Sequence, residues 1–193
     1  MKTILYYFYK CLSKLFGHEI IINYYRSLGM TIGKNTHVFS RIVSSEPFLI
    51  TIGNNVTIST GVNLLTHDAS IGPVAGRDKY SDLVGPIIIG DNCFIGANSI
   101  LLCGTTIPGG SIVAAGSVVT KTVICPEDLQ NTNLLCSSLL DDGIIIGGNP
   151  AKFICKTSDF VNKREFQFLK LHGKSLSERK VVIMQNKEKW VNK

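Results

Sequence analysis

Six cysteines and four histidines are the side chains of this sequence most able to bind a metal ion, form a disulfide or transfer a proton. The cysteines, at positions 11, 93, 103, 125, 136 and 155, include no CxxC pair and no other metal-ligand spacing. Scattered thiols of this kind are typical of a reduced, cytosolic chain. The histidines, at positions 18, 37, 67 and 172, can take up and return a proton near neutral pH. The sequence therefore predicts no metal site and leaves histidine as the candidate acid–base group.

Basic residues are the other chemically informative group, and they gather in the C-terminal tail. The 193 residues carry a formal net charge of +6, but residues 152–193 hold eleven Lys or Arg and four Asp or Glu, against nine and ten in residues 1–151. Such a tail usually forms a solvated helix face. The alternative is a patch for an anionic partner, either a cofactor phosphate or an anionic membrane surface. No nucleic-acid-binding motif accompanies the charge, so we predict no nucleic-acid partner.

The composition and the opening residues exclude several classes of protein. Hydrophobic residues make up 45% of the chain and charged residues 18%, a balance that excludes a wholly disordered chain. No run approaches the roughly 18 apolar residues of a membrane span. The opening stretch is interrupted by Lys10 and Lys14 and lacks a small-residue cleavage site, which argues against a signal peptide. We expect one folded domain with appendages, in the cytoplasm or at the inner face of the membrane.

The elements that position these side chains follow from a six-residue period. A helix would need apolar residues three, four and seven positions apart, and a two-sided strand would alternate without turns. The period instead predicts a short strand and a corner, repeated three times per coil of a triangular solenoid whose coils stack about 4.8 Å apart. The aliphatic residues on this period are Ile89, Ile95, Leu101, Ile107, Val113 and Val119, with Ile52, Ile58 and Leu64 in the same register.

Breaks in this register locate loops. Whole hexads do not fit between Ile32 and Ile52, where two residues remain, or between Leu64 and Ile89, where one remains. Loops that leave a rigid scaffold are where function tends to lie. We therefore predict loops at residues 44–50 and 67–86, and a third at 125–143, after which regular sequence resumes at IIIGGNPAK.

Both ends of the chain lack the hexad. In residues 1–29 apolar residues recur at helical spacing with lysines on another face, which predicts a helical cap over the first coil. Docking on a membrane surface is the alternative role for this segment. Residues 156–193 are predicted to form a basic helical tail, with one helix over 159–171 and a second from about Ser177. The predicted domains are a cap at 1–29, a β-helix at 30–155 and a tail at 156–193.

Together these features resemble the hexapeptide-repeat acetyltransferases, most closely the maltose, galactoside and polysaccharide O-acetyltransferases. The likeness rests on the hexads, on THD at 66–68 before a loop, on PIIIGDNCFIGANSILLCGTTIPGGSIVAAGSVVTK at 86–121 and on GGNPAK at 147–152. The resemblance implies a mainly β fold, a left-handed parallel β-helix, although general crossover rules would favour the right hand. It also implies a homotrimer in which acetyl-CoA, the acetyl donor, lies in the cleft between two β-helices.

By this resemblance His67 is the catalytic base. A sugar hydroxyl is a weak nucleophile at neutral pH, and an imidazole can take its proton as it attacks the thioester and then return it to the thiolate. The group that orients His67 stays open between a backbone carbonyl and a residue of 44–50 such as Glu46, because Asp68 should point to the opposite face of the strand. Glu46 and Asp68 are also candidates for contact with the acceptor sugar, and a solvated position is the alternative for Glu46.

The resemblance assigns five residues to the cofactor. Ala97 and Ala115 match small corner residues beside the pantetheine, where a larger side chain would obstruct the cofactor, although tight corners favour small residues in any case. Thr120 and Lys121 match a TK pair near the adenosine end. Lys152 matches a basic position near the cofactor phosphates. The predicted loop between TK and NPAK departs from the family pattern and leaves the place of Lys152 relative to Lys121 open.

Several functions remain as alternatives. An N-acetyltransferase of an amino sugar and a streptogramin-type acetyltransferase would use the same cofactor cleft. A γ-type carbonic anhydrase would need three zinc-binding histidines, two of them close in sequence. A serine acetyltransferase would need a large N-terminal helical domain, for which the residues before the first hexad are too few. A catalytically inactive β-helix scaffold is the non-enzymatic alternative. The favoured prediction is transfer of an acetyl group from acetyl-CoA to a hydroxyl of a sugar or surface-polysaccharide precursor.

Overall fold

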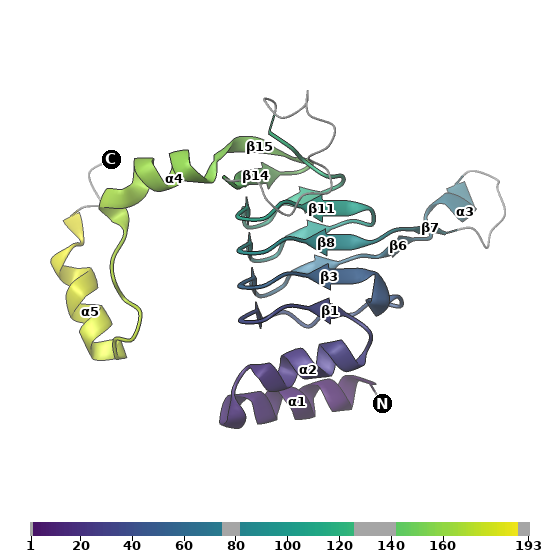
Figure 1. Ribbon diagram of the computed structural model, residues 1–193, viewed down its shortest axis with the longest axis horizontal. Helices are drawn as coiled ribbons and strands as arrows, with labels where there is room; N and C mark the ends of the chain where they lie inside the picture. Colours follow the sequence, from purple (N-terminus) through teal and green to yellow (C-terminus); the bar gives the residue numbers. More distant parts are fainter. Residues whose placement is uncertain (1, 75–81, 126–141, 189–193) are drawn as a thin grey trace. The chain divides into compact units, whose positions relative to one another are not determined.

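The computed structural model describes residues 2–74, 82–125 and 142–188. The chain divides into two compact units, Met1–Thr157 and Ser158–Lys193. The first unit begins with two helices, α1 (Lys2–Phe16) and α2 (Glu19–Ser27), and continues as a stack of short strands (Figure 1). Most of the predicted loop at 125–143 lies outside the described residues.

The strands form three parallel sheets that the chain visits in turn. The first sheet contains β1 (Thr31–Ile32), β3 (Ile50–Ile52), β8 (Ile87–Ile89) and β11 (Thr105–Ile107). The second contains β2 (His37–Val38), β4 (Thr57–Ile58), β9 (Phe94–Ile95), β12 (Ile112–Val113), β14 (Ile144–Gly148) and, antiparallel at its edge, β15 (Ala151–Lys156). The third contains β5 (Asn63–Leu64), β10 (Ile100–Leu101) and β13 (Val118–Val119).

The six-residue period predicted from the sequence is confirmed by the register of these sheets. Along the chain, strands of the first, second and third sheet follow one another, and β8, β9 and β10 each pair with the strand three hexads further on. The paired residues are Ile89 with Ile107, Ile95 with Val113, and Leu101 with Val119. Each coil between β8 and β13 therefore consists of three strands and three corners.

The core is the column of inward-facing aliphatic residues. The six hexad residues from Ile89 to Val119 are at most 1% exposed, and burial of such a side chain contributes about 1.5–3 kcal/mol. Four positions after each of the first five of these residues lies a buried residue whose side chain bonds to the backbone, namely Cys93, Ser99, Thr105, Ser111 and Ser117. The Ser99 hydroxyl, for example, donates to the Ala114 carbonyl at 3.0 Å. Small polar residues at these places allow the corners to turn without an unpaired buried group.

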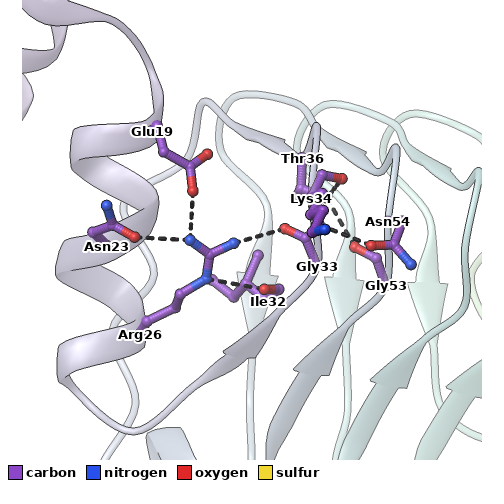
Figure 2. A network of polar contacts seen from close by, with 9 residues as sticks. All are labelled: Glu19, Asn23, Arg26, Ile32, Gly33, Lys34, Thr36, Gly53 and Asn54. Carbon is purple, nitrogen blue, oxygen red and sulfur yellow. Dashed lines mark hydrogen bonds and ion pairs between the residues drawn. The ribbon is translucent and has the colours of Figure 1, made fainter.

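The helices close the first coil, whose β1 edge has no preceding coil to pair with. Arg26 of α2 donates from Nε to the Ile32 carbonyl at 3.0 Å and from Nη2 to the Gly33 carbonyl at 2.9 Å (Figure 2). Glu19 and Asn23 of the same helix accept from Nη1 and hold the guanidinium in place. The Tyr25 hydroxyl, fully buried, donates to the Ser40 carbonyl at 2.9 Å. An otherwise open sheet edge is thus covered by a helix.

The first two predicted interruptions have definite structure. The break at 44–50 contains a 3₁₀ turn, η1 (Pro47–Leu49), just before β3. The loop at 67–86 leaves the coil as an antiparallel pair, β6 (His67–Asp68) with β7 (Leu83–Val84), followed outward by α3 (Ile71–Val74). Figure 1 shows this arm extending away from the stacked coils. The base of the loop is therefore held by pairing of its two strands.

The second unit contains α4 (Thr157–Arg164), which begins one residue before the unit, a 3₁₀ turn η4 (Glu165–Gln167), and α5 (Leu176–Gln185). The helix predicted over 159–171 is shorter than expected, because the chain becomes extended at Phe168. The second predicted helix begins at Leu176, where Ser175 and Glu178 form a capping box. Neither helix buries a residue. Among the residues that the structure describes, no helix is both long and apolar enough to span a membrane.

Candidate active site

His67 lies where the chain leaves the third sheet. It is the first residue of β6 and pairs with Val84 of β7. Its backbone is therefore fixed by the base of the arm, while its side chain keeps 37% of its surface exposed. The position combines a fixed backbone with an accessible imidazole, which is what a proton-transferring side chain needs.

Glu46 reaches His67 from the break at 44–50. Its Oε2 lies 3.0 Å from His67 Nδ1 and also accepts a hydrogen bond of 2.7 Å from the Thr66 hydroxyl. The Ser44 hydroxyl lies 2.8 Å from that of Thr66 and accepts the Glu46 backbone N–H at 3.0 Å. These contacts join the two segments around one carboxylate oxygen. Of the orienting groups that the sequence left open, the structure places Glu46 against the imidazole.

The contact with Glu46 sets the tautomer of the neutral His67 ring and shifts its pKa. An ionised carboxylate accepts hydrogen bonds and cannot donate one. Nδ1 therefore carries a proton, and in the neutral ring Nε2 is free to accept one. The hydrogen bond with Glu46 raises the pKa of His67 above its ordinary value. The hydrogen bonds from His67 and Thr66 lower the pKa of Glu46, which keeps it ionised.

Asp68 has a different local role. Its carboxylate accepts hydrogen bonds from the Ser70 side chain and, through Oδ1 at 2.8 Å, from the Ser70 backbone N–H, and these two bonds lower the pKa of the carboxyl. The exposed carboxylate thus stabilises the turn that follows β6. It also lines the same hollow as His67. Contact of Glu46 or Asp68 with an acceptor sugar remains a prediction.

His67 lies between two hollows of the surface. One is lined by Leu65, His67, Asp68, Ala69, Leu83, Leu102, Cys103 and Thr120. The other is lined by Val43, Ser44, Ser45, Leu64, Leu65, Thr66 and His67. The imidazole can therefore meet two bound groups, one from each side.

Two of the predicted cofactor residues share the corner of His67, which we call the histidine corner. Leu65, Leu102 and Thr120 directly follow β5, β10 and β13 and stack in successive coils, since the Leu65 and Leu102 amides bond to the carbonyls of Leu101 and Val119 at 2.9 Å. Thr120 and the exposed Lys121 thus continue the column that Leu65 begins.

The other three predicted cofactor residues lie at a different corner, between the second and third sheets, which we call the alanine corner. Ala97 follows β9 and Ala115 follows β12, and the Gly116 amide bonds to the Ala97 carbonyl at 2.8 Å. Lys152 of β15 pairs with Gly147, which follows Ile146, the partner of Val113. The corner is tight: a Cβ on Gly96 would lie 2.5 Å from the Ala115 nitrogen. One chain therefore does not bring Lys152 and Lys121 to the same corner.

Sequence reasoning missed several residues of this site. Ser44 and Thr66 complete the contacts of Glu46, and Leu102 and Cys103 line the hollow beside His67. The place of Leu102 and Cys103 could have been found from the register, because they lie one and two residues after Leu101 just as Leu65 and Thr66 follow Leu64. No periodic signal marks Ser44, which lies in the break. Among the described residues, no group of three or more His, Cys, Asp or Glu could hold a metal ion.

Comparison with known proteins gives a consistent result. The family model for the hexapeptide repeat of succinyl-transferase matches residues 86–121. Protein CapG of Staphylococcus aureus is 39% identical over 148 residues, which cover 75% of this chain and 76% of CapG. Galactoside O-acetyltransferase of Escherichia coli K12 is 33% identical over 94 residues, 48% of this chain and 45% of that enzyme. The crystal structure of the hexapeptide-repeat acetyltransferase VCA0836 of Vibrio cholerae, complexed with acetyl-CoA, is similar with a TM-score of 0.51 and 27% identity, over 66% of this chain and 60% of VCA0836.

Proposed function

This chain belongs to the hexapeptide-repeat acetyltransferases and is an acyltransferase, and we propose that it moves an acetyl group from acetyl-CoA to a hydroxyl of a sugar or surface-polysaccharide precursor. The observation that carries the proposal is the 3.0 Å contact of Glu46 with His67 Nδ1 beside a hollow that Thr120 also lines. Acetyl-CoA as donor is supported by its presence in the complex of VCA0836. A hydroxyl as acceptor is supported by the similarity to galactoside O-acetyltransferase.

In the proposed reaction His67 acts through Nε2. Glu46 holds the Nδ1 proton and keeps the ring in the tautomer that can accept. As the acceptor hydroxyl attacks the thioester carbonyl, its proton moves to Nε2, and the oxygen–carbon bond forms. When the carbon–sulfur bond breaks, the imidazolium returns this proton to the leaving thiolate. The negative charge of Glu46 stabilises the imidazolium between these two steps.

We propose that the complete cofactor cleft lies between two chains of a homotrimer, with left-handed coils as in the family. The support is the separation of the histidine corner from the alanine corner within one chain. In a closed ring the histidine corner of each chain can face the alanine corner of its neighbour, which gives three equal clefts. Acetyl-CoA would then lie against Ala97 and Ala115 of one chain, with Lys152 near its phosphates, and meet Thr120 and Lys121 of the next.

Mixing of two inactive variants tests this arrangement. His67→Ala damages only the histidine corner, and Ala115→Trp fills only the alanine corner. If each cleft uses one corner from each of two chains, trimers reassembled from an equal mixture regain about a quarter of the wild-type clefts. No recovered activity after verified exchange of subunits contradicts the shared cleft.

The proposed activity itself is tested by release of free thiol from acetyl-CoA in the presence of candidate acceptors. A panel of neutral sugars, amino sugars, uronic acids and sugar phosphates separates O- from N-acetylation once the product is analysed by mass spectrometry. We expect release that depends on a hydroxylated acceptor and an added mass of one acetyl group. Failure of every acceptor, together with no thermal stabilisation by acetyl-CoA, supports the inactive scaffold instead.

We also propose peripheral contact with an anionic membrane through α1. Ile4, Phe8 and Leu15 of this helix are 77%, 57% and 74% exposed. The helix contains no acidic residue, and Lys10 and Lys14 are exposed on it, which is the composition of an interfacial helix. Co-sedimentation with phosphatidylglycerol vesicles, compared with phosphatidylcholine vesicles, should detect binding that Phe8→Ser weakens. Equal sedimentation of both proteins with both vesicles contradicts it.

A further inference from the structure

A second hollow lies beside the one on the Ser44 side of His67, at the N-terminal helices. This second hollow is lined by Tyr6, Tyr24, Leu28, Met30, Arg41, Ile42, Val43, Ser44 and Pro47. It shares Val43 and Ser44 with the hollow that contains His67. The two hollows thus meet at Val43 and Ser44, and a molecule that occupied both would contact His67 in one and the residues around Arg41 in the other.

Arg41 gives this second hollow its chemical character. The remaining lining residues are apolar or uncharged, so the guanidinium is the charge that a bound molecule meets there. Arg41 is an exposed residue, so its pairing with a bound anion would weaken as the salt concentration rises. The lining residues are thus suited to a molecule that has both an apolar face and an anionic group.

The guanidinium is held in place without being neutralised. Its Nη2 donates to the Thr3 hydroxyl at 2.8 Å, and its central carbon lies 5.6 Å from the Tyr6 ring centre and 6.0 Å from that of Tyr7. Within the described part of the chain, Arg41 makes no ion pair. Arginine has five N–H donors in a fixed plane, so donors remain for a carboxylate or phosphate.

The nearby charges favour an anion as well. Lys10 Nζ also lies 5.6 Å from the centre of the Tyr6 ring and adds positive charge beside this ring, although the lysine lines a different hollow. The closest acidic residue along the segment, Glu46, has its Oε2 engaged by Thr66 and His67. Positive charge on one side and a committed carboxylate on the other leave the Arg41 end electrostatically open to an anionic group.

We infer that Arg41 selects an anionic acceptor, a sugar bearing a carboxylate or a phosphate, and holds that group while a hydroxyl of the same molecule lies at His67 Nε2. This inference rests on the proposed function. The shared chemistry is an oxyanion that pairs with the planar guanidinium. A carboxylate would come from a uronic or sialic-type acid, and a phosphate from an activated sugar.

The test compares acceptors that differ in charge. The measured quantity is kcat/KM for glucuronic acid and for glucose 1-phosphate, each divided by kcat/KM for glucose, in the full-length protein. In the wild type we expect the ratio to exceed one for both anionic acceptors, or for the one whose anionic group, carboxylate or phosphate, matches that of the natural acceptor. In Arg41→Gln that ratio should fall about 10- to 100-fold. Arg41→Lys should restore part of the ratio, and the wild-type preference should weaken at high salt. A preference for glucose in the wild type, or an equal loss for all three acceptors in Arg41→Gln, overturns the inference and leaves acetyl transfer intact.

Two controls separate charge from structure and binding from turnover. Thr3→Val removes the hydrogen bond to Arg41 but keeps the guanidinium, so the ratios should stay within about twofold of wild type, whereas a purely structural role of Arg41 predicts the same loss as in Arg41→Gln.

Calorimetric titration with glucose 1-phosphate and glucuronate measures binding to the site without catalysis. If the wild type binds these anions and Arg41→Gln does not, the result supports the inference even when no thiol is released. The absence of thiol release would then count against the proposed function alone. Equal binding to wild type and Arg41→Gln overturns the inference.

Discussion

His18, in the turn between α1 and α2, and His67, where the chain leaves the third sheet, are the same residue type in opposite surroundings. His67 Nδ1 faces the carboxylate of Glu46 at 3.0 Å, while His18 Nε2 accepts the Val38 backbone N–H at 2.7 Å. The carboxylate favours the charged ring, and its hydrogen bond raises the pKa of His67. Burial, followed by repulsion from His37, lowers the pKa of His18. One imidazole is prepared to take up a proton, and the other is a structural acceptor that must stay neutral.

The two surroundings show that a candidate catalytic base can be recognised by the hydrogen-bond partner of its ring nitrogen. A backbone N–H fixes a ring nitrogen as an acceptor and removes it from chemistry. A carboxylate fixes one nitrogen as a donor and leaves the other available, and it compensates the charge that forms. Accessibility does not separate the two residues, because both are partly buried and each borders a hollow of the surface. The group that faces the ring nitrogen is what distinguishes them.

The largest expected effect is the loss of turnover in His67→Ala. General-base catalysis contributes about 10²–10⁴ in rate, so kcat should fall by that factor. Binding of acetyl-CoA, measured by calorimetric titration, should change little because the imidazole is not assigned to holding the cofactor.

The matched control is His18→Ala, which should reduce thermal stability and leave the kcat of the folded protein within a few-fold of wild type. If the two variants lose turnover equally, the distinction between the two histidines is wrong. Near-normal turnover in His67→Ala removes this residue from the mechanism.

Glu46→Gln is expected to have the next largest effect. The neutral amide no longer compensates the imidazolium, so kcat/KM should fall by roughly 10- to 100-fold, a part of the whole contribution of the base. The wild-type rate should decline with falling pH as His67 becomes protonated, around a pKa raised by Glu46. Removing the carboxylate lowers that pKa, so the acidic limb should move to lower pH. A pH profile of kcat/KM measures this, and an unmoved limb would show that Glu46 does not control His67.

The contrast also shows which parts of the molecule the sequence could predict. Each inward residue of the hexads reports its own place, because a coil can be closed only if every sixth residue faces the core. For that reason Ile89 to Val119 were all correctly assigned. The contact of Glu46 with His67 joins residues 21 positions apart. It depends on how the break at 44–50, which contains a 3₁₀ turn at Pro47–Leu49, folds. The register could locate that break but not the direction in which Glu46 points.

The acceptor role of His18 could not be predicted for a related reason. It depends on the packing of the N-terminal helices on the first coil, where Val38 presents its amide to the ring. Amphipathic spacing predicts that residues 1–29 form helices with a buried face. It does not predict which coil residue meets the turn between α1 and α2.

A smaller effect is expected on stability at acid pH. The pKa of His18 is lowered in the folded protein, so the unfolded chain binds the proton more readily. Its contribution to stability is therefore complete above the ordinary pKa of about 6.5 and is lost as pH falls through the lowered folded value.

His18→Gln separates this contribution from those of other groups, because the amide oxygen can accept from Val38 but does not titrate. Between pH 7.5 and 5 the melting temperature of the wild type should drop more than that of the variant. Each kcal/mol of unfolding free energy that His18 protonation removes should appear as a difference of about 2–4 °C. Parallel curves for the two proteins would show that protonation of His18 does not weaken the cap.

The smallest expected effect is that of Thr66→Val, which tests how far the surroundings of Glu46 matter. The Thr66 hydroxyl is buried and donates to the same Oε2 that His67 contacts. Valine has nearly the same shape, so the 3.0 Å contact of Glu46 with His67 should persist. Loss of one hydrogen bond to a carboxylate leaves the pKa of Glu46 less depressed, and the more basic carboxylate holds the imidazolium slightly more strongly. The acidic limb of the pH profile should therefore move slightly upward, opposite to its direction in Glu46→Gln, while kcat/KM falls only about two- to fivefold from looser positioning. Ser44→Ala removes the next hydroxyl of the network, 2.8 Å from that of Thr66, and should change both quantities less. If kcat/KM fell as much in Thr66→Val as in Glu46→Gln, the Thr66 hydroxyl, rather than the charge of the Glu46 carboxylate, would distinguish His67 from His18.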